Sequence, residues 1–297
     1  MSNEQILAGR GAVVVGGGSG VGLAVAHLLS ANGAGVVVNS RDEGSVAQAT
    51  ESIVRAGGKA VGVPGTAADE TIADRLMDTC ATTFGTVDIL INCAGIAEPV
   101  GSSILNVSTA DWRRQLDSHL TTVFNTCRAA APLMAARGTG SIINTGSFAY
   151  LGDYGGTGYP AGKGAVASLT LALAAELRET GVRVNTVCPG AKTRLSTGPD
   201  YESHIRELHR RGLLDTATMH GSLDAPPPEH AAALYLYLAS DAAREVTGEI
   251  FIAAGGFIGK FLRPAMSPLG YRDHAKEEPW SVEELAAMIG RRDTANP

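Results

Sequence analysis

The chain has 297 residues, of which 44% are hydrophobic and 18% are charged, so it can bury a sizeable core and is not of the disordered class. The formal net charge is -6 and no basic stripe is present, which argues against a nucleic-acid partner. No apolar run approaches the roughly 20 residues that span a membrane, and the first ten residues lack the layout of a signal peptide, so no membrane partner is expected.

The chain alternates between short apolar runs and segments with the period of a helix. The runs, which are mostly β-branched, span 11–16, 34–40, 59–64, 87–92, 140–145, 182–187 and 248–253. The helical segments span 22–31, 45–56, 71–83, 110–137, 159–180 and 228–238. Most of the runs lack apolar–polar alternation, which is typical of parallel strands buried on both faces. The order predicts an α/β fold, a doubly wound Rossmann-type parallel sheet of about seven strands with helices on both faces.

We interpret residues 1–258 as one dinucleotide-binding and catalytic domain in which one segment departs from this alternation. Residues 192–227 are polar, rich in glycine and proline, and include a short charged helix at 201–211. Their length predicts a lid-like insertion over a site. Residues 259–297 follow the last apolar run as a C-terminal tail. There Ser281 and Glu284 predict a capping box and a helix over 281–290, which would dock on another surface such as a neighbouring subunit.

The cysteines and histidines predict no metal site. The four cysteines are scattered and form no C-x-x-C pair, so they are expected to be buried, reduced thiols in a cytoplasmic protein. They are Cys80, Cys93, Cys127 and Cys188. The seven histidines show no zinc-type pairing with cysteine or with one another.

The first apolar run leads into a glycine-rich turn that predicts a dinucleotide site. Residues 13–26 read V-V-V-G-G-G-S-G-V-G-L-A-V-A, and a helix follows at once. Gly16, Gly20 and Gly22 let the backbone approach a pyrophosphate, and the helix N-terminus offers N–H groups and positive dipole. Ser19 and Val21, in the same turn, are further candidate cofactor-binding residues. The spacing is G-x-x-x-G-x-G rather than G-x-G-x-x-G.

The end of the second run bears on which cofactor is bound. Ser40 and Arg41 stand where a carboxylate would accept the ribose 2′-hydroxyl of NAD. An arginine can instead pair with a 2′-phosphate, so NADP is preferred over NAD. The alternative is a surface Arg41 paired with Asp42 or Glu43.

Tyr159 and Lys163 form the candidate catalytic pair. At a spacing of four they share one helix face, and a nearby ammonium favours tyrosinate, so Lys163 is predicted to lower the tyrosine pKa from its usual value of about 10. Ser147 ends a strand before a glycine-rich loop, where its hydroxyl can meet a carbonyl oxygen. Taken alone, the pair fits an exposed helix start with two ordinary surface side chains better; the glycine turn and Ser147 favour the catalytic interpretation.

Five motifs in order give the chain a family resemblance along residues of about 8–260. They are G-G-G-S-G-V-G (16–22), N-C-A-G (92–95), S-F-A-Y (147–150), Y-P-A-G-K (159–163) and P-G-A-K-T (189–193). With these motifs the chain resembles the short-chain dehydrogenases/reductases. The resemblance implies hydride transfer between a nicotinamide and a secondary alcohol or ketone. Tyr159 would be the general acid/base, Lys163 would bind the nicotinamide ribose, and Ser147 would hold the substrate oxygen.

The resemblance also implies where the cofactor would lie. Asn92 and Ala94, with Gly95 beside them, would line its adenosine side. Pro189, Gly190 and Thr193 would flank the nicotinamide. The acid that usually follows the third strand is absent; Thr66, next to Ala67, stands near that place and would meet the adenine more weakly.

Two further positions depart from the family pattern. Val15 precedes the first glycine where threonine is usual, so a turn-stabilising hydroxyl is missing. His119 stands where an asparagine usually helps to hold a water in the proton relay from lysine. We hypothesise that His119 substitutes in this relay, since histidine can donate, accept or itself carry the proton. The alternative is a packed helix histidine with a satisfied ring.

A narrower resemblance bears on the substrate. The segments 189–195 and 238–251 and the tail are similar to reductases related to the (3R)-hydroxyacyl-CoA dehydrogenase part of multifunctional enzymes, which implies a 3-oxoacyl thioester or another apolar ketone. Imine reduction, epimerisation or dehydration on the same site, or cofactor binding without turnover, stay open as alternatives. The family implies a dimer or tetramer through helices 110–137 and 159–180, and we expect a homotetramer.

Overall fold

The computed structural model describes residues 5–154 and 156–290. Residues 1–4, 155 and 291–297, which the predicted domain and tail include, lie outside the described residues. The chain forms two compact units, the first ending at Phe261 and the second beginning at Leu262.

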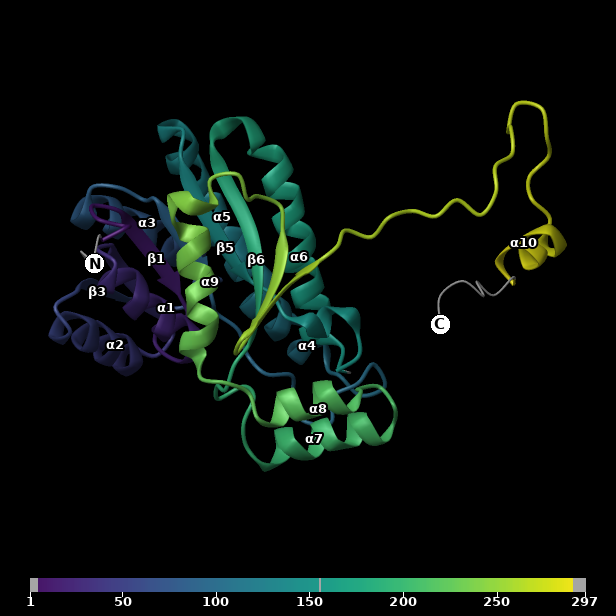
Figure 1. The fold of residues 1–297 in the computed structure, drawn as a ribbon, viewed down its shortest axis with the longest axis horizontal. Coiled ribbons are helices and arrows are strands. Elements are labelled where there is room, and N and C mark those ends of the chain that lie inside the picture. Colours follow the sequence, from purple (N-terminus) through teal and green to yellow (C-terminus); the bar gives the residue numbers. More distant parts are fainter. Residues whose placement is uncertain (1–4, 155, 291–297) are drawn as a thin grey trace. The chain divides into compact units, whose positions relative to one another are not determined.

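The first unit is built on one sheet of eight strands in the order β3-β2-β1-β4-β5-β6-β7-β8 (Figure 1). The strands are β1 (Gly11–Val15), β2 (Gly35–Ser40), β3 (Lys59–Pro64), β4 (Ile89–Asn92), β5 (Gly140–Thr145), β6 (Val182–Gly190), β7 (Ile250–Ala254) and β8 (Phe257–Phe261). Strands β1 to β7 pair in parallel, so the predicted doubly wound parallel sheet is confirmed.

The eighth strand is the one that the sequence prediction missed. β8 pairs antiparallel with β7 across a turn at Gly255 and Gly256. It lies at the edge of the sheet, and Phe257 and Ile258 are exposed. An edge strand of this kind lacks the continuous apolar run that marks the buried strands.

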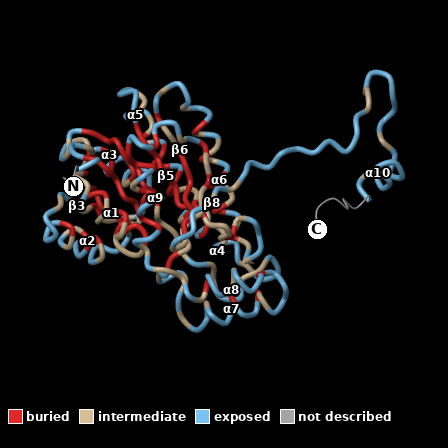
Figure 2. The backbone as a smooth tube through the Cα atoms, viewed as in Figure 1, coloured by how far each residue is buried: buried red, intermediate tan, exposed pale blue. Residues whose placement is uncertain are grey.

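The central strands are mostly apolar because helices cover both faces of the sheet. In β1, Ala12 and Val14 belong to one buried cluster, whereas Val13 and Val15 belong to another. The first cluster includes side chains of α1 (Gly20–Ala31), α2 (Glu43–Arg55) and α9 (Pro228–Ala239). The second includes side chains of α3 (Glu70–Phe84), α5 (Thr122–Arg137) and α6 (Gly158–Glu176). Figure 2 shows this buried interior along the strands.

The predicted helix 110–137 is interrupted in the structure. It consists of α4 (Thr109–Leu116), a π-helical turn (Asp117–Thr121) and α5. A π-turn inserts a wider hydrogen-bonding register into an α-helix and is frequent at functional sites. His119 lies in this turn.

The 192–227 insertion contains two helices rather than the single one predicted. They are α7 (Pro199–Arg210) and α8 (Thr216–Leu223), which lie side by side in Figure 1. They enclose a small core of Ile205, Leu208 and Leu214. The neck of the insertion is closed by the Lys192 N–H, which donates to the Pro226 carbonyl at 2.7 Å.

The second unit contains one helix, α10 (Val282–Ile289), among its described residues. Ser281 and Glu284 form the expected capping box. Arg272 stacks on Trp280, with 3.8 Å from the guanidinium carbon to the ring centroid, and pairs with Glu284 at 2.7 Å.

The described residues contain four free cysteines and no group of three or more potential metal ligands. No helix in this part of the chain is both long and apolar enough to cross a membrane.

Candidate active site

The candidate residues gather where parallel strands end. β1 and β4 are neighbours in the sheet although β2 and β3 lie between them in sequence. Their connections therefore leave in opposite directions, and in doubly wound sheets ligands bind at such a switch point, outside the carboxyl ends of the strands. Gly16 follows β1 here and Ala94 follows β4, and a Cβ on Gly16 would lie 2.6 Å from the Ala94 nitrogen.

The glycine turn is closely packed against its neighbours. Gly16 and Gly20 have φ angles of +79° and +54°, which disfavour other residues. A Cβ on Gly22 would lie 2.3 Å from the Gly16 carbonyl oxygen, so strand and helix are in close contact. Val21 packs its side chain in the core, which leaves only its backbone for a ligand.

The start of the insertion lies against this turn. The Arg194 guanidinium donates to Ser19 Oγ at 2.8 Å, and a Cβ on Gly20 would lie 3.3 Å from Thr193 Cγ2. Ser19 is the N-cap of α1 but makes no side-chain capping bond. Sequence reasoning did not select Arg194, although it directly follows the P-G-A-K-T motif.

Arg41 is exposed and its side chain has no hydrogen-bond or ion-pair partner within the described part of the chain. Asp42 instead caps α2 by accepting from the Ser45 N–H at 2.7 Å, and its hydrogen bonds with Ser45 lower the pKa of its carboxyl. The alternative of Arg41 paired with Asp42 or Glu43 is therefore not what the structure shows. The guanidinium is available to an anion.

The remaining adenosine-side residues differ in accessibility. Thr66 is exposed beyond β3, whereas Ala67 packs in the core. The Asn92 side chain is buried, donates to Asn144 Oδ1 at 3.0 Å and accepts from Thr126 at 2.8 Å. Its amide therefore ties β4 to β5 and α5 and does not face a ligand.

At the other end of the site, β6 ends at Pro189 and Gly190. A Cβ on Gly190 would lie 2.6 Å from Ala254 Cβ, so a larger residue would displace β7. Thr193 follows in the insertion, and its N–H donates to Ser196 Oγ at 2.9 Å.

Ser147, Tyr159 and Lys163 converge between β5 and α6. Ser147 follows β5, and its hydroxyl is hydrogen-bonded to that of Tyr159. Lys163 is buried, donates from Nζ to the Thr145 carbonyl at 2.8 Å, and lies with Nζ 5.8 Å from the Tyr159 ring centroid. The three predicted side chains are thus brought together.

The net effect of the protein on the tyrosine is opposite to the predicted one. Burial raises the pKa of Tyr159 above its ordinary value of 10, and the hydrogen bond with Ser147 only partly offsets this. Burial also lowers the pKa of Lys163 to about 8. Desolvation opposes both charged forms, whereas the prediction rested on the Lys163 ammonium and a cationic nicotinamide and left burial out.

His119 is buried and holds one ring nitrogen without a partner. Its Nε2 lies 3.1 Å from the Ile96 carbonyl and 3.1 Å from Gln115 Oε1. Gln115 donates its amide to the Ala97 carbonyl at 2.7 Å, which fixes its oxygen toward the ring. Because both neighbours of Nε2 are acceptors, Nε2 carries the hydrogen and Nδ1 has a free lone pair, and this buried Nδ1 has no partner among the described residues.

The unpartnered Nδ1 lies in the neighbourhood of the catalytic lysine. A Cβ on Gly95 would lie 3.1 Å from Nδ1 and 3.8 Å from Lys163 Nζ, so both atoms lie beside Gly95. The His119 and Tyr159 rings meet edge to face at 5.0 Å. Burial, with the Lys163 charge, lowers the pKa of His119 to about 2, so the ring is a neutral acceptor and does not itself carry a second proton.

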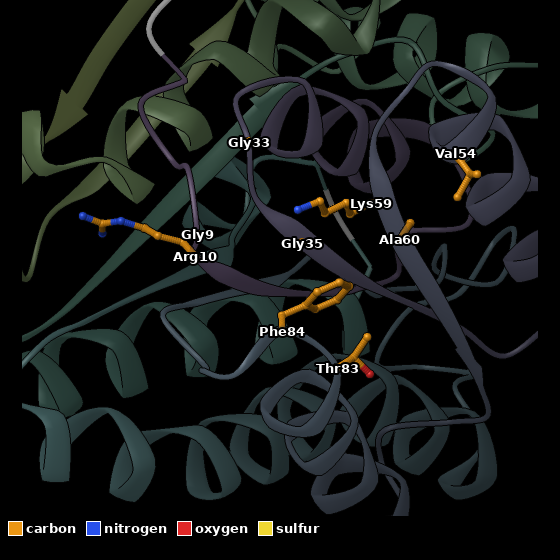
Figure 3. Close-up of a pocket in the computed structure, with 9 residues that line it drawn as sticks. All are labelled: Gly9, Arg10, Gly33, Gly35, Val54, Lys59, Ala60, Thr83 and Phe84. Atoms are coloured by element: carbon orange, nitrogen blue, oxygen red, sulfur yellow. The ribbon is translucent and has the colours of Figure 1, made fainter.

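A hollow of about 400 Å³ lies at the opposite edge of the sheet (Figure 3). Its lining includes Gly35 and Lys59, the first residues of β2 and β3, and Arg10, which pairs with Asp241 at 2.6 Å. None of the predicted site residues lines it.

The family model described as Enoyl-(Acyl carrier protein) reductase matches residues 15–258. The chain belongs to the short-chain dehydrogenases/reductases. As a member it is an NAD(P)-dependent oxidoreductase with the Rossmann-type fold described above.

Relatives in this family differ in how much of the chain they cover. A cis-4-hydroxycyclohexanecarboxylate dehydrogenase of Sinomonas cyclohexanicum is 36% identical over 85% of this chain and 98% of its own length. Hydroxyacyl-CoA dehydrogenase ChsB1 of Mycobacterium tuberculosis is 32% identical over 97% of this chain and 90% of its own. The crystal structure of a short chain dehydrogenase from Mycobacterium avium is 32% identical, covers 96% of this chain and 94% of its own, and has a TM-score of 0.79.

Proposed function

We propose that the protein transfers a hydride reversibly between NADP, in preference to NAD, and a secondary alcohol or ketone, with Tyr159 as general acid/base. The convergence of Ser147, Tyr159 and the buried Lys163 at the carboxyl edge of the sheet carries this proposal. Imine reduction, epimerisation and dehydration have no comparable observation in their favour.

The residues present fit a dinucleotide. Gly16 and Gly20 leave bare backbone at the start of α1, where a pyrophosphate would be held, and the unpaired Arg41 would hold a 2′-phosphate. Pro189, Gly190 and Thr193 would flank the nicotinamide. When bound, the nicotinamide supplies or accepts the hydride.

The protein's own groups would handle the substrate oxygen and its proton. In reduction, the Tyr159 hydroxyl donates its proton to the substrate oxygen while Ser147 donates a hydrogen bond to the same atom. The Lys163 ammonium stabilises the tyrosinate that remains. His119 Nδ1 accepts a hydrogen bond from a water that links it to Lys163, which completes the relay in place of the usual asparagine.

We infer a 3-oxoacyl thioester or another apolar ketone as substrate. The relative named hydroxyacyl-CoA dehydrogenase aligns with 97% of the chain, which includes most of the C-terminal tail. The segment that follows Ser147 is aromatic and packs on the insertion: Phe148 and Tyr154 meet at 4.9 Å, and Tyr154 packs with Tyr201 of α7 against the α7–α8 core.

Turnover on a panel of carbonyl compounds tests the proposal. Purified protein is mixed with NADPH or NADH and with cyclic ketones and 3-oxoacyl thioesters, and cofactor oxidation is followed. We expect Tyr159→Phe to lower kcat by about 100-fold or more. Tyr237→Phe, at an exposed tyrosine of α9, is the matched control. Cofactor binding without turnover of any carbonyl would refute the proposal.

We further propose a homo-oligomer, a dimer or tetramer, formed through α5 and α6. On α5, Phe124 and Leu133 are 51% and 41% exposed, so this helix offers apolar side chains that a second copy would cover. Four free thiols fit a cytoplasmic, reducing compartment.

A further inference from the structure

The first turn of the catalytic helix has no cap of its own. Thr157, the N-cap of α6, makes no side-chain capping bond. The first N–H groups of a helix have no partner within the helix and must find one elsewhere. Tyr159 is the second residue of α6, so its backbone position depends on how this turn is held.

Glu98, from the loop that follows β4, supplies the missing acceptor. Its carboxylate accepts from the backbone N–H groups of Thr157 at 3.4 Å, Gly158 at 3.3 Å and Tyr159. Ser102 Oγ donates to the same carboxylate at 2.8 Å. A negative charge at a helix N-terminus is favoured by the helix dipole.

The surrounding loop is shaped to this carboxylate. Gly156 has a φ of +77°, and a Cβ there would lie 3.0 Å from Glu98 Cγ. Glu98 is half-buried and has no ion pair with any described residue. Its charge is therefore compensated by hydrogen-bond donors of the catalytic helix rather than by a surface cation.

The same loop also orients the relay histidine. The Ile96 carbonyl accepts from His119, and the Ala97 carbonyl accepts from Gln115, which in turn faces His119. Three successive residues of one loop thus hold the groups on both sides of Lys163. A shift of this loop would move Tyr159 and His119 together.

We propose that Glu98 is a positioning residue that fixes the general acid/base Tyr159 through its backbone and adds a negative charge beside it. This inference rests on the proposed function and deepens it. Removal of this acceptor is expected to shift the position of Tyr159 through its backbone.

Glu98→Gln keeps the side-chain shape but replaces one acceptor oxygen by an NH2 group that faces N–H donors. We expect kcat to fall about tenfold, as for loss of a charge-assisted hydrogen bond, with the Kd for NADPH unchanged. Glu284→Gln, at the glutamate that accepts from the Ser281 N–H at the start of α10, is the matched control.

Amide hydrogen exchange at Gly158 and Tyr159 separates this inference from the proposed function, since it needs no turnover. Faster exchange in Glu98→Gln, with an unchanged melting temperature, supports the cap even if no carbonyl is reduced. Unchanged exchange and an unchanged kcat would overturn it. A joint loss of melting temperature and NADPH affinity would also overturn it, because Glu98 would then support the fold in general.

Ser102→Ala decides the question if Glu98→Gln does not fold. It removes one donor to the carboxylate from a loop outside the helix. Faster exchange at Tyr159 and a lower kcat with unchanged NADPH affinity support the proposal. Wild-type exchange and kcat overturn it.

Discussion

Replacing His119 tests the proposed proton relay behind Lys163. His119→Ala removes both the Nε2 donor shared by Ile96 and Gln115 and the free Nδ1 acceptor. Loss of the donor leaves buried oxygens unsatisfied, at a cost of about 1–3 kcal/mol in the free energy of unfolding. Loss of the acceptor interrupts the relay, so we expect kcat to fall about 100-fold, the lower end of what positioned proton-transfer groups contribute.

Two further substitutions at His119 separate chemistry from packing. His119→Phe keeps an aromatic ring against Tyr159 but has neither nitrogen, so its kcat should fall as far as that of the alanine variant. His119→Asn offers one donor and one acceptor, which can replace Nε2–H and Nδ1, and should retain most of kcat. Steady-state and single-turnover rates, with the melting temperature of each variant, provide the comparison.

The pH dependence of these variants tests the neutral state of the ring. Burial lowers the pKa of His119 to about 2, so the ring is uncharged throughout the range in which the protein is assayed. Wild type and His119→Asn should therefore share the same limbs between about pH 5 and 8. Disappearance of an ionisation near neutrality in His119→Asn would refute the buried, neutral histidine. Wild-type rates in both His119→Ala and His119→Phe would refute the relay.

Three other results are expected. Arg41→Ala should weaken NADPH binding roughly 10- to 100-fold, as for loss of a hydrogen bond to a charged group, and should leave NADH binding unchanged in a fluorescence titration. Arg55→Ala is the control. Equal losses of affinity for both cofactors would contradict the assignment of Arg41 to the 2′-phosphate. Burial lowers the pKa of Lys163 to about 8, so its ammonium is lost above that pH and kcat/KM for alcohol oxidation should fall there. A kcat/KM that continues to rise to about pH 10 would contradict this expectation. Tyr154→Phe removes the 2.9 Å hydrogen bond to Ser222 in the insertion. The KM for the ketone should rise severalfold, and amide hydrogen exchange over 199–223 should become faster. An unchanged KM and unchanged exchange would show that other contacts hold the insertion.

The strands and helices could be predicted from the sequence where burial gives their apolar residues a simple repeating pattern. Each residue of β1 is buried, alternately in one cluster or the other, so its apolar run predicts a strand covered on both faces. β8 could not be predicted in the same way, because an exposed edge strand needs no such run. The π-turn at Asp117–Thr121 was also missed, since the sequence there keeps an ordinary helical pattern while the hydrogen-bond register changes.

The candidate site could be predicted only where a local spacing fixes the geometry. Tyr159 and Lys163 share a helix face because they are four apart, and the glycine turn has its own conformational signature. The free Nδ1 of His119 and the cap from Glu98 depend on where distant loops return, which no local pattern records. The prediction of the tyrosine pKa counted the charges of Lys163 and of the nicotinamide and omitted the cost of burial.

That omission changes how the protonation of the site is understood. Unperturbed tyrosine and lysine lose their protons at similar pH, about 10 and 10.4. In this site burial raises the pKa of Tyr159 and lowers that of Lys163 to about 8, so the lysine proton leaves first as pH rises. At neutral pH the pair therefore consists of a phenol and an ammonium, the forms needed to donate a proton to a ketone oxygen. Alkaline conditions alone remove the ammonium before they generate tyrosinate, so alcohol oxidation depends on additional positive charge at the site, which the oxidised nicotinamide would supply.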